Sequence, residues 1–224
     1  MAHEERLMSV PHDRRSFISV VASLAGLAAA SASADQQPRD QSATASGAFD
    51  IAWIDQMNGK HKQLYDLGGL ELAVEPRPLR FARNFLDTFH DVYHLEYPDI
   101  NTAVGISGPA FPMNASDRLW AKYKLGERSK IIDPMTKQPA VRNIFFDDGG
   151  GTSVKAIQAR GAVFWQCNVA LGAVAQQLAA AFQMPPAEVR ADLIAGLNPG
   201  VRLVPSHVMA LGLAQERGFT YMKP

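Results

Sequence analysis

"AVFWQCNVALGAVAQQLAAAF", residues 162–182, is the stretch that decides the fold. Its first residues form an apolar run typical of a buried strand, and from Asn168 onward the pattern is strongly helical. Strands of a parallel sheet are joined by crossover helices of this kind, because parallel neighbours cannot be connected by a tight turn. The stretch therefore predicts a strand, a helix, and a junction between them at Cys167.

The same alternation continues on both sides of this stretch. Further apolar runs predict strands, and amphipathic patterns between them predict helices. The expected strands cover residues 61–67, 100–107, 200–206 and 219–224, and the expected helices cover 78–95, 117–126, 152–161, 185–197 and 207–218. Residues 126–151 are polar and irregular, with a Gly-rich run that indicates a loop. We therefore expect one α/β domain over residues 48–224, a mainly parallel sheet with helices on both faces, in the three-layer manner of flavodoxin-like and Rossmann-like folds.

Composition agrees with this expectation. The chain has 224 residues, of which 47% are apolar, so it can bury one substantial core. Its 22 basic residues balance its 22 acidic residues, and no run of Lys or Arg stands out. A protein that binds nucleic acid through a basic face is therefore not expected.

The N-terminus resembles an export signal. Arg14 and Arg15, followed by Ser-Phe-Ile, resemble the twin-arginine motif, and residues 32–34, Ala-Ser-Ala, fit the small-residue cleavage pattern. We therefore expect a signal peptide over residues 1–34, a flexible linker over residues 35–47, and a periplasmic mature protein that is not bound to the membrane. The alternative is an anchoring N-terminal helix, although small residues interrupt the apolar part and weaken it as a membrane span.

Cys167 is the only cysteine in the chain, so it cannot form an internal disulfide. Proteins of the oxidising periplasm usually carry cysteines in pairs, and a single one is buried, paired with another molecule, or kept for chemistry. Cys167 stands at the start of a predicted helix, where unpaired N–H groups and the helix dipole favour a thiolate or a persulfide anion. The alternative is a free cysteine that only fills the core.

Two other predicted strand ends carry residues suited to a site. Sites of open parallel sheets form beyond the carboxyl ends of the strands, so these residues share one edge with Cys167 if the strands are neighbours. With Cys167 as the catalytic residue, the candidate ligand-binding residues are Ser107, Gly108, Pro109, Asn168, Ser206 and His207. Asn168 is expected to cap the helix or to donate an amide hydrogen bond to bound sulfur or an anion.

No metal and no cofactor is expected. His90 and His94 are four residues apart on one helix, but no third ligand accompanies them in a recognisable motif. The Gly-rich run before residue 152 lacks the lysine and the spacing of a phosphate-binding loop. Haem on His207 or Cys167 is an alternative that no motif requires.

The C-terminal half resembles DsrE-like proteins. "GVRLVPSHVMALGLAQERGFTYMKP" (200–224) is similar to the ending of that family, "GAVFWQCNVAL" (161–171) to its strand and cysteine segment, and "GISGPAF" (105–111) to a loop usually written with His-Gly-Pro. The match is diffuse over residues 60–224 and most specific in the last 25 residues.

The resemblance implies a small α/β domain that carries sulfur as a persulfide on the strand-end cysteine, here Cys167, and passes it to a partner. It also implies a homo-oligomer, often a trimer or hexamer, or a protein partner in sulfur relay. This chain departs from the pattern in having Ser107 where many relatives have His, a longer insertion around residues 117–151, and an export signal where most relatives of known role are cytoplasmic.

Two functions fit these residues. The first is a periplasmic protein that binds or relays sulfane sulfur on Cys167, either as an enzyme or as a carrier. The second is a non-enzymatic ligand-binding or subunit-assembly module, exported folded, in which the cysteine is structural. In that case the binding surface is expected to come from the loop 126–151 and from Trp53, Trp120, Tyr123 and Trp165.

Overall fold

Strand β2 (Ile100–Ile106) lies at the centre of a five-stranded sheet, and all seven of its residues are buried. The computed structural model, which describes residues 49, 51–74, 77–147 and 149–224, places the strands in the order β4-β3-β2-β1-β5, with every neighbouring pair parallel. The other strands are β1 (His61–Asp66), β3 (Val163–Cys167), β4 (Val201–Val204) and β5 (Thr220–Met222). The predicted α/β fold with a parallel sheet is therefore confirmed.

The predicted signal peptide, residues 1–34, and the predicted linker, residues 35–47, lie outside the described residues. Among the residues that are described, no helix combines the length and the apolar character that crossing a membrane requires.

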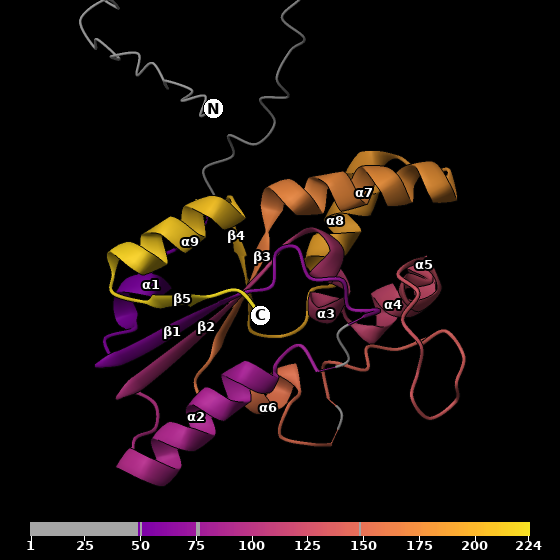
Figure 1. Ribbon diagram of the computed structural model, residues 1–224. Coiled ribbons are helices and arrows are strands. Elements are labelled where there is room, and N and C mark those ends of the chain that lie inside the picture. The colour runs from indigo at the N-terminus through magenta and orange to yellow at the C-terminus, as the bar shows by residue number, and fades with distance from the viewer. Residues whose placement is uncertain (1–48, 50, 75–76, 148) are drawn as a thin grey trace, which may run out of the picture. The chain divides into compact units, whose positions relative to one another are not determined.

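Helices cover both faces of the sheet (Figure 1). Helices α1 (Trp53–Gln56) and α9 (His207–Glu216) lie on one face, and α2 (Arg80–Tyr93) and α6 (Val154–Gln158) lie on the other. Side chains along each strand alternate between the two faces, as the pleat requires. Those that pack with α1 and α9 include Leu64, Ala103 and Trp165, and those that pack with α2 and α6 include Tyr65, Val104 and Phe164.

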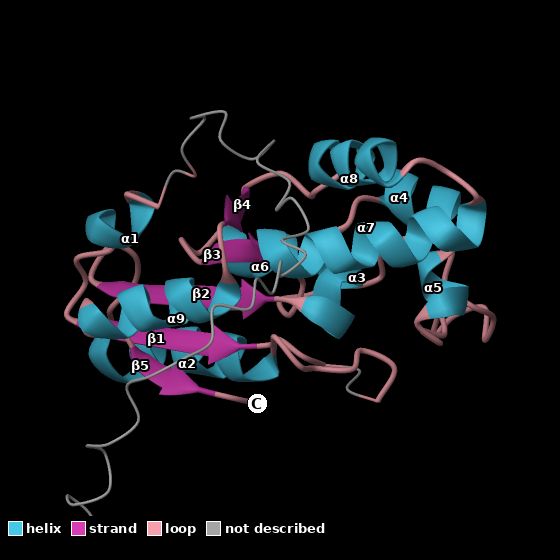
Figure 2. Ribbon diagram, turned by 90° about the horizontal axis from the view of Figure 1, so that it is seen from above, coloured by secondary structure: helices cyan, strands magenta, loops and turns pink. Residues whose placement is uncertain are grey.

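A second group of helices lies beyond the carboxyl ends of the strands, where the arrowheads in Figure 2 point. It contains a 3-10 turn (Gly108–Ala110), α3 (Phe111–Asn114), α4 (Asp117–Tyr123), α5 (Leu125–Arg128), α7 (Asn168–Phe182) and α8 (Pro186–Ala195). On the face of the sheet covered by α2 and α6, the first turn of α6 is capped by Ser153, whose hydroxyl accepts the N–H of Ala156 at 3.2 Å. The helices of the second group extend the core past the edge of the sheet at which the site was predicted.

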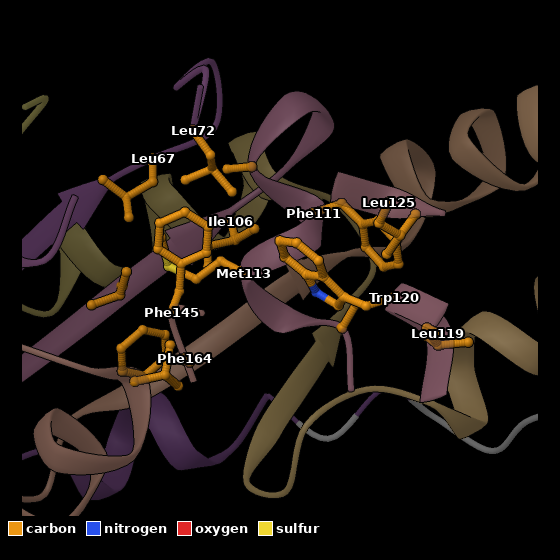
Figure 3. Packing of buried hydrophobic residues seen from close by; sticks show 14 of the residues in the cluster. Leu67, Leu72, Ile106, Phe111, Met113, Leu119, Trp120, Leu125, Phe145 and Phe164 are labelled. Atoms are coloured by element: carbon orange, nitrogen blue, oxygen red, sulfur yellow. The ribbon is translucent and has the colours of Figure 1, made fainter. Parts of the chain in front are cut away.

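The polar segment 126–151 is anchored in the core, which its composition did not indicate. Ile131, Ala140 and Phe145 are buried, and Figure 3 shows Phe145 in the same cluster as Ile106 and Met113. Asn143 is buried beside them. Its amide nitrogen donates to the backbone carbonyls of Pro112, Met113 and Ala115, and its side-chain oxygen accepts the N–H groups of Phe145 and Phe146. One amide therefore ties the segment to α3.

The aromatic residues that were expected to supply a binding surface are core residues instead. Trp53 is 4% exposed, and Trp120, Tyr123 and Trp165 are fully buried. Trp120 donates its ring N–H to the Pro112 carbonyl at 2.8 Å, and Tyr123 packs edge-on against Phe182. That expectation is wrong, because in this fold the large aromatic rings fill space between the sheet and its helices.

Candidate functional site

The carboxyl ends of β2, β3 and β4 lie side by side, as the strand-end argument required. Ile106 of β2 pairs with Gln166 of β3, and Cys167 of β3 pairs with Val204 of β4. The chain leaves β3 into α7, which packs into the same cluster as α2 and α6, but leaves β4 into α9 on the opposite face. The segments that leave the carboxyl ends of β3 and β4 therefore turn to opposite faces of the sheet. Open parallel sheets form their ligand sites between two neighbouring strands of this kind.

The Cys167 sulfur lies between two helix starts. Sγ accepts the N–H of Ala170, in the first turn of α7, at 3.4 Å, and the N–H of His207, the first residue of α9, at 3.2 Å. These helices have 15 and 10 residues. Each helix start directs backbone N–H groups and the positive end of its dipole towards the sulfur. Cys167 is only 4% exposed, so this environment is largely shielded from bulk water.

The cap of α7 is the Cys167 sulfur and not Asn168. Asn168 is the first residue of the helix, and its side-chain oxygen accepts a hydrogen bond from the guanidinium of Arg190 at 2.6 Å. The amide of Asn168 is therefore tied to α8, and the expectation that it caps the helix is wrong.

The imidazole of His207 is held by the protein on both of its nitrogens. The indole N–H of Trp165 donates to Nδ1 at 3.1 Å, and Nε2 lies 2.7 Å from Oδ1 of Asp66. Because an indole nitrogen can only donate, Nδ1 must be the acceptor, and Nε2 carries the proton that it shares with Asp66. The backbone of His207 contacts the sulfur while its ring faces the sheet, so Cys167 and His207 do not form a nucleophile–base pair.

Asp66, at the end of β1, receives three hydrogen bonds. Besides His207, the donors are the backbone N–H of Gly68 at 2.8 Å and the hydroxyl of Tyr221 at 2.7 Å. Burial by itself raises the pKa of this carboxyl, but the hydrogen bonds from Tyr221, Gly68 and His207 outweigh it, and the pKa lies below its usual value. Asp66 is therefore a carboxylate that fixes the position of His207.

Two glycines make room for the His207 ring. A Cβ atom at Gly68 would lie 2.6 Å from Nε2 of His207, and a Cβ at Gly105 would lie 2.8 Å from its Cε1 atom. Carbon atoms in contact are normally about 3.5–4.0 Å apart, so a side chain at either position collides with the ring. The absence of a side chain on β2 at Gly105 thus permits His207 to pack against the sheet.

The other predicted site residues lie at the same edge. Ser107 and Ser206 precede the 3-10 turn and α9, and each contributes a backbone carbonyl to the first turn, which accepts from Ala110 at 3.2 Å and from Ala210 at 3.0 Å respectively. Gly108 and Pro109 line a cavity of about 310 Å³ between the 3-10 turn, α5 and α7. Gly108 and Pro109 thus face this cavity, whereas Asn168, Ser206 and His207 do not line it.

Sequence reasoning missed two residues of this edge, Asp66 and Arg128, and it assigned Trp165 to a binding surface and not to the hydrogen bond with His207. Asp66 stands at the carboxyl end of a correctly predicted strand and precedes Gly68-Gly69, so the same strand-end argument was able to find it. Nothing local distinguishes Trp165 from the apolar run around it. Arg128 lies in the polar stretch after α4, and its place in the cavity wall depends on the packing of that segment.

No metal site forms from the described residues, in which no group of three or more His, Cys, Asp or Glu side chains is placed to hold an ion. His90 instead pairs with the carboxylates of Asp91 and Glu96, and His94 lies past the end of α2 with a φ of 57°. The two histidines therefore do not share one helical face.

No protein-family model matches the chain, and comparison with curated proteins and with solved structures gives no significant match. The fold that the resemblance to DsrE-like proteins implies, an α/β domain with a parallel sheet, is present. The argument for function consequently depends on the geometry around Cys167.

Proposed function

We propose that this protein is an exported, DsrE-like carrier of sulfane sulfur that holds the sulfur atom as a persulfide on Cys167. The observation that carries the proposal is the pair of backbone N–H groups, from Ala170 and His207, that point at Sγ from two helix starts. Hydrogen bonds to charged groups are stronger than those to neutral ones, so two N–H donors at this position suit a bound persulfide anion.

The loading step needs no external oxidant. The Cys167 thiolate attacks a sulfane sulfur atom of a polysulfide or thiosulfate donor, and a new S–S bond forms at Sγ. The S–S bond of the donor breaks, and its electron pair leaves with the shortened polysulfide or with sulfite. The product is a cysteine persulfide anion, and the reverse reaction with an acceptor thiolate or another nucleophile unloads it.

A second function is favoured by a different observation. Cys167 is 4% exposed and its sulfur caps α7, which is also how a structural cysteine behaves. In this alternative the protein is a binding or assembly module, and the thiol only completes the junction of β3 and α7. The two functions differ in whether reagents of small size modify the sulfur in the folded protein.

Intact mass spectrometry of the full chain distinguishes them. After incubation with inorganic polysulfide and removal of excess donor, the proposal expects additions of about 32 Da per sulfur atom on the wild type. Cys167→Ser, which keeps a hydrogen-bond acceptor at the cap, is the matched control and should gain nothing. Equal masses for the two proteins before and after treatment would refute sulfur carriage and leave the structural cysteine.

We further propose that the chain is exported by the twin-arginine route and meets its partner at the Cys167 edge, either another copy of itself or a sulfur-relay protein. Val169 and Val208, next to the two helix starts, are 67% and 75% exposed, and exposed apolar residues beside a reactive group suit a docking surface. Replacing Arg14 and Arg15 together by Lys should block export, and charged substitutions at Val169 and Val208 should abolish complex formation. Unchanged export of the Arg14/Arg15 variant would contradict the twin-arginine route. An unchanged mass in solution of the Val169/Val208 variant would contradict a partner at this edge.

A further inference from the structure

The cavity beside Cys167 has a single charged side chain. It is enclosed by the 3-10 turn and α3 on one side, by α5 on another, and by the face of α7 that carries Ala170, Ala173 and Val174. Its volume is about 310 Å³, and of the twelve described residues that line it only Arg128 is charged. The lining combines apolar side chains with Ser129, Gln177 and Arg128, and apolar walls that carry a few placed polar groups are typical of a site for a small organic ligand.

The two ends of the cavity differ in chemistry. At one end Ala170 lines the cavity, and its N–H donates to the sulfur of Cys167, which lies behind Ala170 and does not itself line the cavity. At the other end the Arg128 guanidinium lies 5.9 Å from the ring of Phe182, the last residue of α7. A helix rises about 1.5 Å per residue, so the lining that α7 contributes, from Ala170 to Leu178, spans about 12 Å. The cavity therefore extends from Ala170, beside the thiol, past Ala173 and Val174 towards the cationic side chain of Arg128.

A second cavity of about 250 Å³ shares Pro109, Arg128 and Ser129 with the first. It adds Glu71 and Lys130, whose opposite charges balance each other. Arg128 lines both cavities, and it is the charged residue among the described residues that line the first. A planar guanidinium in such a place matches a carboxylate or sulfonate, which it binds through two parallel hydrogen bonds.

We propose that this cavity selects the sulfur donor, and that the donor is a small organic persulfide with an apolar chain and an anionic group at the end remote from its sulfur. This inference rests on the proposed function and names the substrate class of the same site. The anionic group pairs with Arg128, the chain lies along α7, and the terminal sulfur reaches Cys167.

The transfer step balances without a further reactant. The Cys167 thiolate attacks the terminal sulfur of the donor persulfide anion, and the Sγ–S bond forms as the S–S bond of the donor breaks. The electron pair leaves on the donor's inner sulfur, which departs as an organic thiolate and takes a proton from water. One persulfide is consumed and one is formed, so the total oxidation state of sulfur is unchanged.

The test compares two donors of equal length on the full chain, the persulfides of ω-mercaptohexanoate and of the neutral ω-mercaptohexanol. Loading of Cys167 is followed by intact mass in the wild type, in Arg128→Gln, and in Arg142→Gln, which removes an exposed charge of the same segment that does not line the cavity. The anionic donor should load the wild type and Arg142→Gln about tenfold faster than the neutral donor, and Arg128→Gln should erase this preference. A preference that Arg128→Gln leaves intact overturns the inference.

A binding arm separates this inference from the proposed function. Hexanoate, which cannot transfer sulfur, is titrated into Cys167→Ala and into Cys167→Ala/Arg128→Gln and followed by NMR shifts of α7 amides. Weaker binding in the double variant supports the anion site independently of sulfur chemistry, and equal binding overturns it. Inorganic polysulfide should load wild type and Arg128→Gln alike. If inorganic polysulfide loads neither protein while the binding of hexanoate still depends on Arg128, the proposed function fails. The cavity then remains a site for organic anions but not for a sulfur donor.

Discussion

Gly105→Ala places a methyl group where two rings of the site already lie. The new Cβ atom would be 2.7 Å from Cε2 of Trp165 and 2.8 Å from Cε1 of His207, about 1 Å inside ordinary carbon contact. Trp165 is fully buried against Trp53, with ring centroids 5.9 Å apart, so it cannot move without disturbing the core. Overpacking of this kind costs about 1–3 kcal/mol, and loss of the Trp165–His207 hydrogen bond adds about 1 kcal/mol.

We therefore expect Gly105→Ala to lower the free energy of unfolding by about 2–4 kcal/mol. The assay is urea unfolding followed by tryptophan fluorescence and analysed by linear extrapolation. Gly69→Ala is the matched control, because a Cβ at Gly69 meets no atom within 4 Å, and its stability should lie within about 0.5 kcal/mol of the wild type.

The same substitution tests the connection between the sheet and the sulfur. Displacing His207 withdraws its backbone N–H from Cys167, so loading by polysulfide should slow about tenfold at a temperature where the variant is folded. If Gly105→Ala unfolds at the same urea concentration as Gly69→Ala, the packing argument is refuted. If it is destabilised but loads sulfur at the wild-type rate, the His207 N–H does not contribute to reactivity.

Three further predictions concern stability. Gly172→Ala and Gly212→Ala, in α7 and α9, meet no atom within 4 Å and should each raise the free energy of unfolding by about 0.5–1 kcal/mol in urea; a loss of stability would contradict the reported helix packing. Asp66→Asn should destabilise by about 1–3 kcal/mol near neutral pH. Because the pKa of Asp66 is lowered in the folded state, the wild type loses its extra stability over Asp66→Asn as the pH falls below about 4. A difference in the free energy of unfolding that stays constant down to pH 2 would contradict the lowered pKa. Burial raises the pKa of Asp192, but hydrogen bonds from Lys122, Tyr123 and Arg118 outweigh it and lower the pKa to about 2. Asp192→Asn should therefore lower the free energy of unfolding by about 1–2 kcal/mol above pH 4, and by progressively less below it, in thermal or urea unfolding. An unchanged stability at pH 7 would refute the pairing.

The fold was accessible from the sequence because the neighbouring strands β2 and β3 are buried on both faces. Residues 100–106 and 163–167 are runs that only a parallel sheet covered by helices can bury, and they were predicted nearly to their observed ends. The pattern left the order of the strands open, and the structure shows that the chain crosses from β4 at one edge of the sheet to β5 at the other. The sequence therefore predicted that Cys167 stands at a strand end, whereas the adjacency of β2, β3 and β4 is known from the structure.

The partners of the site were not accessible in the same way. Asp66 and His207 are 141 residues apart, and Asn143 holds α3 through three carbonyls that no pattern marks. Whether a histidine at a helix start faces solvent or the sheet depends on a missing side chain at Gly105, on another strand. Such contacts arise from packing between distant segments, whereas periodicity reports only the local one.

The central claim is that Cys167 takes up sulfane sulfur and gives it back, and cyanolysis measures both steps at once. Full-length protein is treated with polysulfide, freed of excess donor, and incubated with cyanide, which removes the outer sulfur of a persulfide as thiocyanate and restores the thiolate. The account predicts about one thiocyanate per wild-type chain and none from Cys167→Ser. Thiocyanate in equal amounts from both proteins, or from neither, would contradict it.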